Sequence, residues 1–264
     1  MPSAQVNGIE LYYERAGVGP RLLFLNGSGS TLASIAPLIE VFAGHLDVVA
    51  HDQRGLGRSA VPLGPYTMAQ YAADALGLLD TVGWTTCRVV GVSFGGMVAQ
   101  ELAVTAPARV ERLALLCTSP GGAGGASYPL HELAGLSPSE RAEVSTRLLD
   151  SRFSEQWLAT YPQDHALVDT MAQRRSAPLS ADARRGEAEQ LGARRHHDVW
   201  DRLGRITCPT FVGAGRFDGI APLSNSQAIA GRVAGATLHV YEGGHAFFAQ
   251  DRRALPEIIE FLGS

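Results

Sequence analysis

A short glycine-flanked turn around Ser93 restricts the fold of this chain more than any other feature. The turn, residues 91–95 with the sequence GVSFG, follows an apolar run at 87–90 that predicts a buried strand and precedes a run at 97–103 that predicts a helix. The two glycines leave out side chains that would collide in so sharp a turn. We therefore expect the serine to stand at the end of a strand, where the first N–H groups of the helix face it.

Strand and helix patterns alternate along most of the 264 residues. Further buried strands are predicted at 21–25, 47–50, 110–117, 210–214 and 236–241, and helices at 31–44, 68–82, 224–233 and 252–262. An alternating segment at 5–14, around Asn7-Gly8, predicts an antiparallel hairpin at a sheet edge. This order of elements predicts an α/β fold, with a mostly parallel sheet that is covered by helices on both faces.

The pattern changes after residue 119. Residues 121–125 (GGAGG) predict a flexible linker, and residues 128–203 show charge-rich helical patterns without a convincing strand. We expect residues 1–119 and 205–264 to form one core, and residues 120–204 to form a mobile helical lid, or cap, inserted into that core. The lid would lie over the carboxyl ends of the strands, where open α/β sheets bind ligands.

The composition argues against several classes of protein. The formal net charge of −4 and the isoelectric point near 6.1 argue against a nucleic-acid partner. No apolar run approaches the roughly 18 residues that span a bilayer. Residues 1–4 do not resemble the start of a signal peptide, so we expect a cytoplasmic protein with no membrane partner. The chain has no lysine, which excludes Schiff-base chemistry on a lysine.

The cysteine and histidine content gives no sign of a metal site. Cys87, Cys117 and Cys208 lie far apart in apolar surroundings, which predicts buried reduced thiols. His196 and His197 are adjacent on a predicted helix and would point to different faces, so we expect solvated residues rather than metal ligands. We expect neither a metal nor an organic cofactor.

Two further segments complete a recognisable pattern. Asp218 lies in the sequence GRFDGIAP, just after a predicted strand, and His245 lies in GGHAFF, just after the last one. With the turn at Ser93, this order of serine, aspartate and histidine resembles the α/β-hydrolase family over nearly the whole chain. The resemblance implies a sheet of the eight-stranded type and a helical lid after the strand that ends near Cys117. It also implies a catalytic triad of Ser93, Asp218 and His245.

The chemistry of the three side chains gives each one a role. A serine hydroxyl is a weak nucleophile until a base takes its proton, and an imidazole can accept and return a proton near neutral pH. We therefore expect Ser93 to attack, His245 to act as general base and Asp218 to hold the tautomer of the imidazole. The predicted strand that ends near Cys117 has no carboxylate after it, so Asp218 has no rival of equal standing.

The resemblance also implies an oxyanion hole made of two backbone N–H groups. Phe94, directly after the nucleophile, supplies one of them. The loop NGSGS after the strand at 21–25 supplies the other, from Ser28 by position and from Gly27 as the alternative. The family usually has His-Gly where this chain has Asn26-Gly27, and we expect both residues to border the substrate. The alternative is that this loop is an ordinary turn.

Phe153 and Trp157 are candidates for substrate contacts from the lid. Both belong to an aromatic stretch that would give the lid an apolar face. The alternative is that they only pack the lid against the core. The segment DQRGLGRS at 52–59 resembles a loop found in many lidded members of the family, and we expect Asp52 and Arg54 to fix turns there rather than to catalyse.

A serine in the turn, where dehalogenases and epoxide hydrolases of the family have aspartate, indicates acyl transfer. We expect hydrolysis of a small to medium carboxylic ester or lactone through an acyl-enzyme, by a monomer or homodimer. Enol-lactonases resemble this chain in having asparagine before the oxyanion loop, which favours small esters and lactones. Carbon–carbon bond hydrolases and metal-free haloperoxidases or perhydrolases use similar triads and stay open as alternatives. A receptor that only binds a small ligand is a further alternative.

Overall fold

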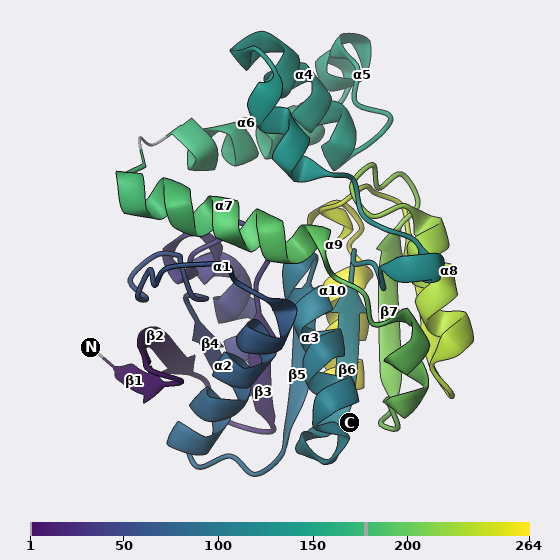
Figure 1. Cartoon of the computed structure of the whole chain (residues 1–264). Helices are drawn as coiled ribbons and strands as arrows, with labels where there is room; N and C mark the ends of the chain where they lie inside the picture. The colour runs from purple at the N-terminus through teal and green to yellow at the C-terminus, as the bar shows by residue number, and fades with distance from the viewer. Residues whose placement is uncertain (1, 177–178) are drawn as a thin grey trace.

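An eight-stranded, mostly parallel sheet forms the centre of the molecule, as predicted (Figure 1). The computed structural model describes residues 2–176 and 179–264. The strand order is β1-β2-β4-β3-β5-β6-β7-β8, with β1 and β2 antiparallel to their neighbours and the remaining pairs parallel. The strands are β1 (Ser3–Val6), β2 (Ile9–Ala16), β3 (Arg21–Leu25), β4 (Asp47–His51), β5 (Cys87–Val92), β6 (Val110–Leu116), β7 (Thr210–Gly215) and β8 (Thr237–Tyr241).

Helices cover both faces of this sheet. One face packs against α2 (Met68–Thr81), α3 (Phe94–Thr105) and α8 (Leu223–Arg232), and the other packs against α1 (Leu32–Ala43), the short α9 (Phe247–Gln250) and α10 (Ala254–Gly263). Strand β3 illustrates why the central strands are apolar throughout. Leu23 belongs to the first of these cores, while Leu22 and Phe24 belong to the second. Both faces of a central strand are buried, so a continuous apolar run is needed.

The long connection between β6 and β7 is helical. Its described residues form α4 (Pro138–Leu149), α5 (Glu155–Thr160), α6 (Pro162–Ser176) and α7 (Ala181–Arg195), together with three 3-10 turns. In Figure 1, α4, α5 and α6 gather at one end of the molecule, and α7 crosses between them and the sheet. Of the described residues in this connection, none belongs to a strand, and only an isolated bridge joins Gly121 to Asp198. The exact limits of a lid at 120–204 stay a prediction.

Residues 121–125, predicted to be a flexible linker, form a turn with a bridge to a distant residue. Gly122–Gly124 form a 3-10 turn, and the N–H of Gly121 donates to the carbonyl of Gly125 at 3.1 Å. The bridge to Asp198 fixes the start of this turn. A glycine-rich sequence therefore forms a defined turn here, paired with a residue distant in sequence.

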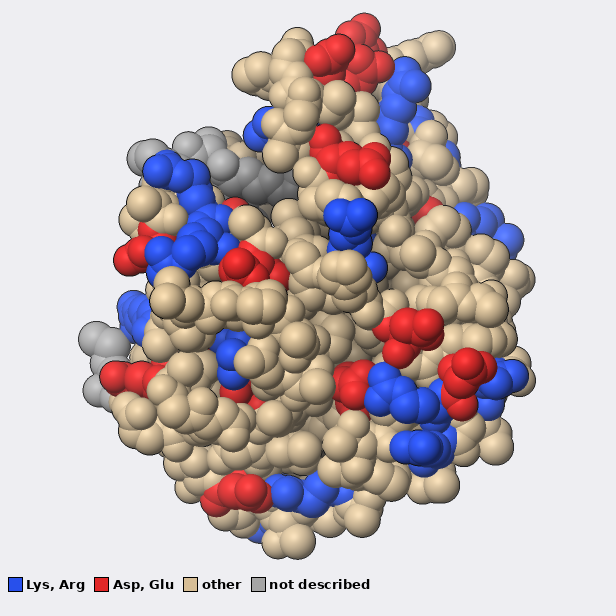
Figure 2. All heavy atoms as spheres, in the orientation of Figure 1, with Lys and Arg blue, Asp and Glu red and all other residues tan. Residues whose placement is uncertain are grey.

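Two other expectations concern the cysteines and the surface. Cys87, Cys117 and Cys208 are buried free thiols, as predicted. Acidic and basic side chains are interspersed over the face shown in Figure 2. Among the helices of the described part of the chain, none is long and apolar enough to cross a membrane.

Candidate active site

Ser93 lies in a strained turn between β5 and α3. Its φ of 56° and ψ of −114° are unusual for a residue with a side chain, and its N–H donates to the carbonyl of Leu116 on β6 at 2.8 Å. A Cβ on Gly91 would lie 2.4 Å from the carbonyl oxygen of Gly95, and a Cβ on Gly95 would lie 2.0 Å from that of Leu25. The backbone segments are thus too close for any residue but glycine at these two positions.

Ser93, His245 and Asp218 form a continuous chain of hydrogen bonds. The Oγ of Ser93 lies 2.9 Å from Nε2 of His245, and Nδ1 of His245 lies 2.8 Å from Oδ2 and 3.0 Å from Oδ1 of Asp218. The Asp218 carboxylate also accepts the N–H groups of Ile220 and Ala221, both at 2.8 Å. It has no exposed surface, whereas the His245 side chain is 14% exposed. The structure thus brings together the three residues predicted from the sequence.

The end of α4 positions the loops that carry Asp218 and His245. The carbonyl of Leu149 accepts the N–H of His245 at 2.6 Å, and the carbonyl of Leu148 accepts that of Gly219 at 3.1 Å. Sequence reasoning missed these contacts. A carbonyl at a helix end carries no side-chain signal, so the sequence offered nothing to find them by.

The loop after β3 lies directly beside Ser93. A Cβ on Gly27 would be 3.6 Å from the Cβ of Ser93, which places this loop where an oxyanion hole is expected. The N–H of Phe94 belongs to the first turn of α3, where N–H groups have no acceptor within the helix. The Oγ of Ser28 is buried and has no hydrogen-bond partner among the described residues. The participation of the N–H groups of Ser28 and Phe94 stays a prediction.

Asn26 is engaged by other parts of the protein. Its Nδ2 donates to the carbonyl of Ser30 at 2.9 Å, and the Nε2 of Gln53 donates to both the Oδ1 and the backbone oxygen of Asn26 at 2.7 Å. These bonds fix the shape of the loop. Contacts of Asn26 and Gly27 with a substrate stay predictions.

The loop at 52–59 has the structural role that the sequence predicted. The Asp52 carboxylate accepts the N–H groups of Leu32 at 2.7 Å and Arg58 at 2.8 Å. Arg54 forms a buried two-bond ion pair with Asp74, with distances of 2.6 and 2.8 Å.

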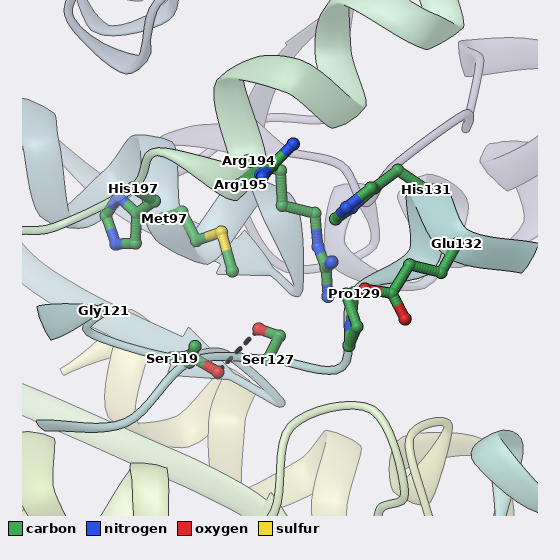
Figure 3. A pocket seen from close by; sticks show the side chains of 11 residues that line it. Met97, Ser119, Gly121, Ser127, Pro129, His131, Glu132, Arg194, Arg195 and His197 are labelled. Carbon is green, nitrogen blue, oxygen red and sulfur yellow. Dashed lines mark hydrogen bonds between the residues drawn. The ribbon is translucent and has the colours of Figure 1, made fainter.

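A cavity of about 340 Å³ lies beside α3 under the C-terminal end of α7 (Figure 3). It borders Met97, whose N–H donates to the carbonyl of Ser93 at 3.3 Å, so the cavity begins one helical turn from the nucleophile. Its polar wall includes Ser119 and Ser127, whose hydroxyls are 2.7 Å apart, as well as Arg194 and His197.

Phe153 and Trp157 do not line this cavity. Phe153 is almost completely buried. The Nε1 of Trp157 donates to Asp164 at 2.8 Å, and its ring packs 4.3 Å from that of Tyr161. These contacts favour the packing alternative, and a contact of either residue with a substrate stays a prediction.

Two residues of the cavity wall were not predicted from the sequence. His197 was expected to be solvated, which is wrong because it is only 6% exposed, and burial lowers its pKa to about 4. Arg194 is also 6% exposed. Burial lowers its pKa to about 10, although the charge of Asp218 acts in the opposite direction. In the sequence both residues belong to a charged stretch that is typical of a surface helix.

Comparison with known proteins agrees with this geometry. A family model described as the alpha/beta hydrolase fold matches residues 20–251. The chain belongs to the α/β-hydrolase fold family. RutD of Variovorax paradoxus, whose name describes it as a candidate carbamate hydrolase, is 33% identical over 252 residues, 89% of each chain. A poly(3-hydroxyalkanoate) depolymerase of Ectopseudomonas oleovorans is 29% identical, with 91% of this chain and 83% of the relative covered. The crystal structure of the enol-lactonase from Burkholderia xenovorans superimposes with a TM-score of 0.81 at 26% identity, over all of both chains.

Proposed function

We propose that this α/β hydrolase cleaves a small to medium carboxylic ester or lactone through an acyl-enzyme on Ser93. The observation that carries the proposal is the unbroken chain of hydrogen bonds from Ser93 through His245 to Asp218. The names of two similar proteins, an enol-lactonase and a depolymerase of a polyester, support ester-type bonds as the target. The helical segment at 120–204 is proposed to act as the lid over the site.

The first half of the reaction forms the acyl-enzyme. Nδ1 of His245 donates to Asp218, so Nε2 is free to take the proton of the Ser93 hydroxyl as Oγ bonds to the carbonyl carbon. The N–H groups of Phe94 and Ser28 stabilise the oxyanion. The tetrahedral intermediate then collapses, His245 gives its proton to the leaving alkoxide, and the ester C–O bond breaks.

The second half releases the acid. Water attacks the acyl carbon and gives a proton to Nε2 of His245. The second tetrahedral intermediate expels the Ser93 oxygen, which recovers that proton. The products are the carboxylic acid and the alcohol, or one hydroxy acid when the substrate is a lactone.

Hydrolysis of 4-nitrophenyl acetate, butyrate and octanoate tests this proposal. Turnover should fall by at least about 10³-fold in Ser93→Ala. The exposed Ser224→Ala variant on α8 is the matched control and should retain full activity. Equal turnover in Ser93→Ala and the natural protein would exclude Ser93 as nucleophile. Ligand binding without turnover of any ester would favour a receptor. Cleavage of carbon–carbon bonds without turnover of any ester would favour a carbon–carbon bond hydrolase.

A further inference from the structure

Two side chains on one face of α7 connect the cavity to the loop beside Ser93. Gln190 and Arg194 are four residues apart, so they lie next to each other on the same side of the helix. The Oε1 of Gln190 accepts the N–H of Gly29, in the loop after β3, at 2.8 Å. One turn further on, the Arg194 side chain extends from α7 into the cavity toward Pro129 (Figure 3). The same face of α7 therefore contacts the loop beside Ser93 and borders the cavity.

The Arg194 guanidinium is buried without a full set of partners. Its Nη1 donates to the carbonyl of Tyr128 at 2.7 Å, but its Nε and Nη2 have no partner among the described residues. Buried donors are normally satisfied, and a buried charge without a counter-charge is unfavourable. With a pKa of about 10, the side chain keeps its charge at neutral pH. A buried arginine in this condition can accept an anion from outside the protein.

The unsatisfied atoms define the shape of that anion. Nε and Nη2 form one edge of the planar guanidinium, and this edge matches the two oxygens of a carboxylate. The same chain uses this edge elsewhere, because Nε and Nη2 of Arg54 hold the two carboxylate oxygens of Asp74 at 2.6 and 2.8 Å. In Arg194 the same edge has no partner within the described ranges of the chain, and protein atoms cover it at the wall of the cavity that Arg194 lines.

No carboxylate of the described residues fills this position. Glu132 also lines the cavity, but it is exposed and forms no ion pair with Arg194. The Asp218 carboxylate interacts with Arg194 by charge, without a hydrogen bond. The Asp218 oxygens already accept bonds from His245, Ile220 and Ala221.

We propose that Arg194 binds a carboxylate of the substrate, so that the ester or lactone cleaved at Ser93 also carries a free acid group. This inference rests on the proposed function and adds the substrate class. The Met97 and Pro129 side chains provide the apolar wall for the carbon chain between the two groups. The cavity of about 340 Å³ is in the range that suits a small ligand.

A pair of esters of equal shape tests the proposal by kinetics. Monomethyl glutarate carries a carboxylate, and methyl 5-methylhexanoate has an isopropyl group in its place. We expect the natural protein to prefer the acid in kcat/KM, and Arg194→Gln to lower kcat/KM for the acid on the order of 10- to 100-fold. The neutral ester should change by less than about threefold. Arg184→Gln, which removes an exposed arginine from the same helix, is the matched control and should leave both values unchanged.

Binding to the Ser93→Ala variant separates this inference from the proposed function. Calorimetry should detect glutarate, with dimethyl glutarate at least about tenfold weaker, and this difference should disappear when Arg194→Gln is added. Arg194→Lys keeps the charge but not the planar edge, so it should bind glutarate with intermediate affinity. It replaces Arg194→Gln in this test if that variant does not fold. Glu132→Gln should not increase affinity, because Glu132 is not the partner of Arg194.

The outcomes decide between the two proposals. If Ser93 is required for neutral esters but Arg194→Gln leaves the preference between the two esters unchanged, the inference is wrong and the proposed function stands. If no ester is turned over while glutarate binds through Arg194, the carboxylate site stands and the proposed function is wrong. If no ester is turned over and glutarate does not bind, both proposals are wrong.

Discussion

Gln190 of α7 and Gly29 of the loop after β3 are joined by a hydrogen bond of 2.8 Å between Oε1 and the backbone N–H. Gln190 is 1% exposed, so its end of this bond is buried, while Gly29 lies at the surface. Close by, a Cβ on Gly186 of α7 would lie 1.9 Å from the carbonyl oxygen of Gly55, so the helix and the core are in direct backbone contact. The helix that borders the cavity therefore also fixes the loop beside Ser93.

Loss of the Gln190 side chain should therefore reduce catalysis more than binding. In Gln190→Leu the N–H of Gly29 loses its acceptor, and the oxyanion loop is no longer held in one position. We expect kcat for 4-nitrophenyl butyrate to fall by about tenfold, the effect of a loosened oxyanion hole, with little change in KM. Ala188→Leu, which places a leucine at an exposed position of the same helix, is the control. An unchanged kcat in Gln190→Leu would show that Gln190 has no positioning role.

Asp218→Asn should remove most of the activity while the fold is retained. The amide can turn its NH₂ group toward Nδ1 of His245, which favours the tautomer that cannot take the Ser93 proton. We expect kcat to fall on the order of 10³- to 10⁴-fold. Asp201→Asn, at an exposed ion pair with Arg232, should have no effect on kcat. Near-normal turnover in Asp218→Asn would mean that another carboxylate acts as the acid.

Substitution of Gly95 should destabilise the whole protein. The Cβ of an alanine would lie 2.0 Å from the carbonyl oxygen of Leu25, so β3 and α3 would have to separate. We expect Gly95→Ala to lower the free energy of unfolding by about 3 kcal/mol or more, at the upper end for overpacking. Urea denaturation measures this. Gly135→Ala is the control, since a Cβ there meets nothing within 4 Å. Equal stability of the two variants would contradict the steric argument.

The parts of the site that could be predicted depend on short local signals. The turn at Ser93 needs glycine on both sides, and this local signal made the triad predictable. The strands of a sheet covered on both faces are continuous apolar runs, so the strands and their alternation with helices could also be predicted. The burial of Arg194 could not be predicted, because nothing in the α7 sequence tells which of its arginines faces the core. His197 was predicted to be solvated, and residues 121–125 were predicted to be flexible, because both predictions used the local sequence alone. Contacts with partners distant in sequence decide both cases.

Two buried histidines should make the protein sensitive to acid. Burial lowers the pKa of His51 and of His197 to about 4, although the charge of Asp74 acts in the opposite direction on His51. The unfolded chain protonates these side chains near pH 6.5, whereas the folded chain does not until about pH 4. The unfolded state therefore binds more protons between these values, and stability falls as the pH is lowered through this window.

The size of this effect can be measured on one histidine. From pH 7.5 to pH 5, a single group of this kind costs about 2 kcal/mol of unfolding free energy. Replacing it with a residue that does not titrate, as in His51→Leu, should reduce the loss of stability over that range by about this amount in urea denaturation. His196→Gln, at an exposed position next to His197, is the control and should lose as much stability as the natural protein. If His51→Leu loses as much stability as the control, His51 is not the group that titrates, because removing a group with a lowered pKa must flatten the dependence on pH.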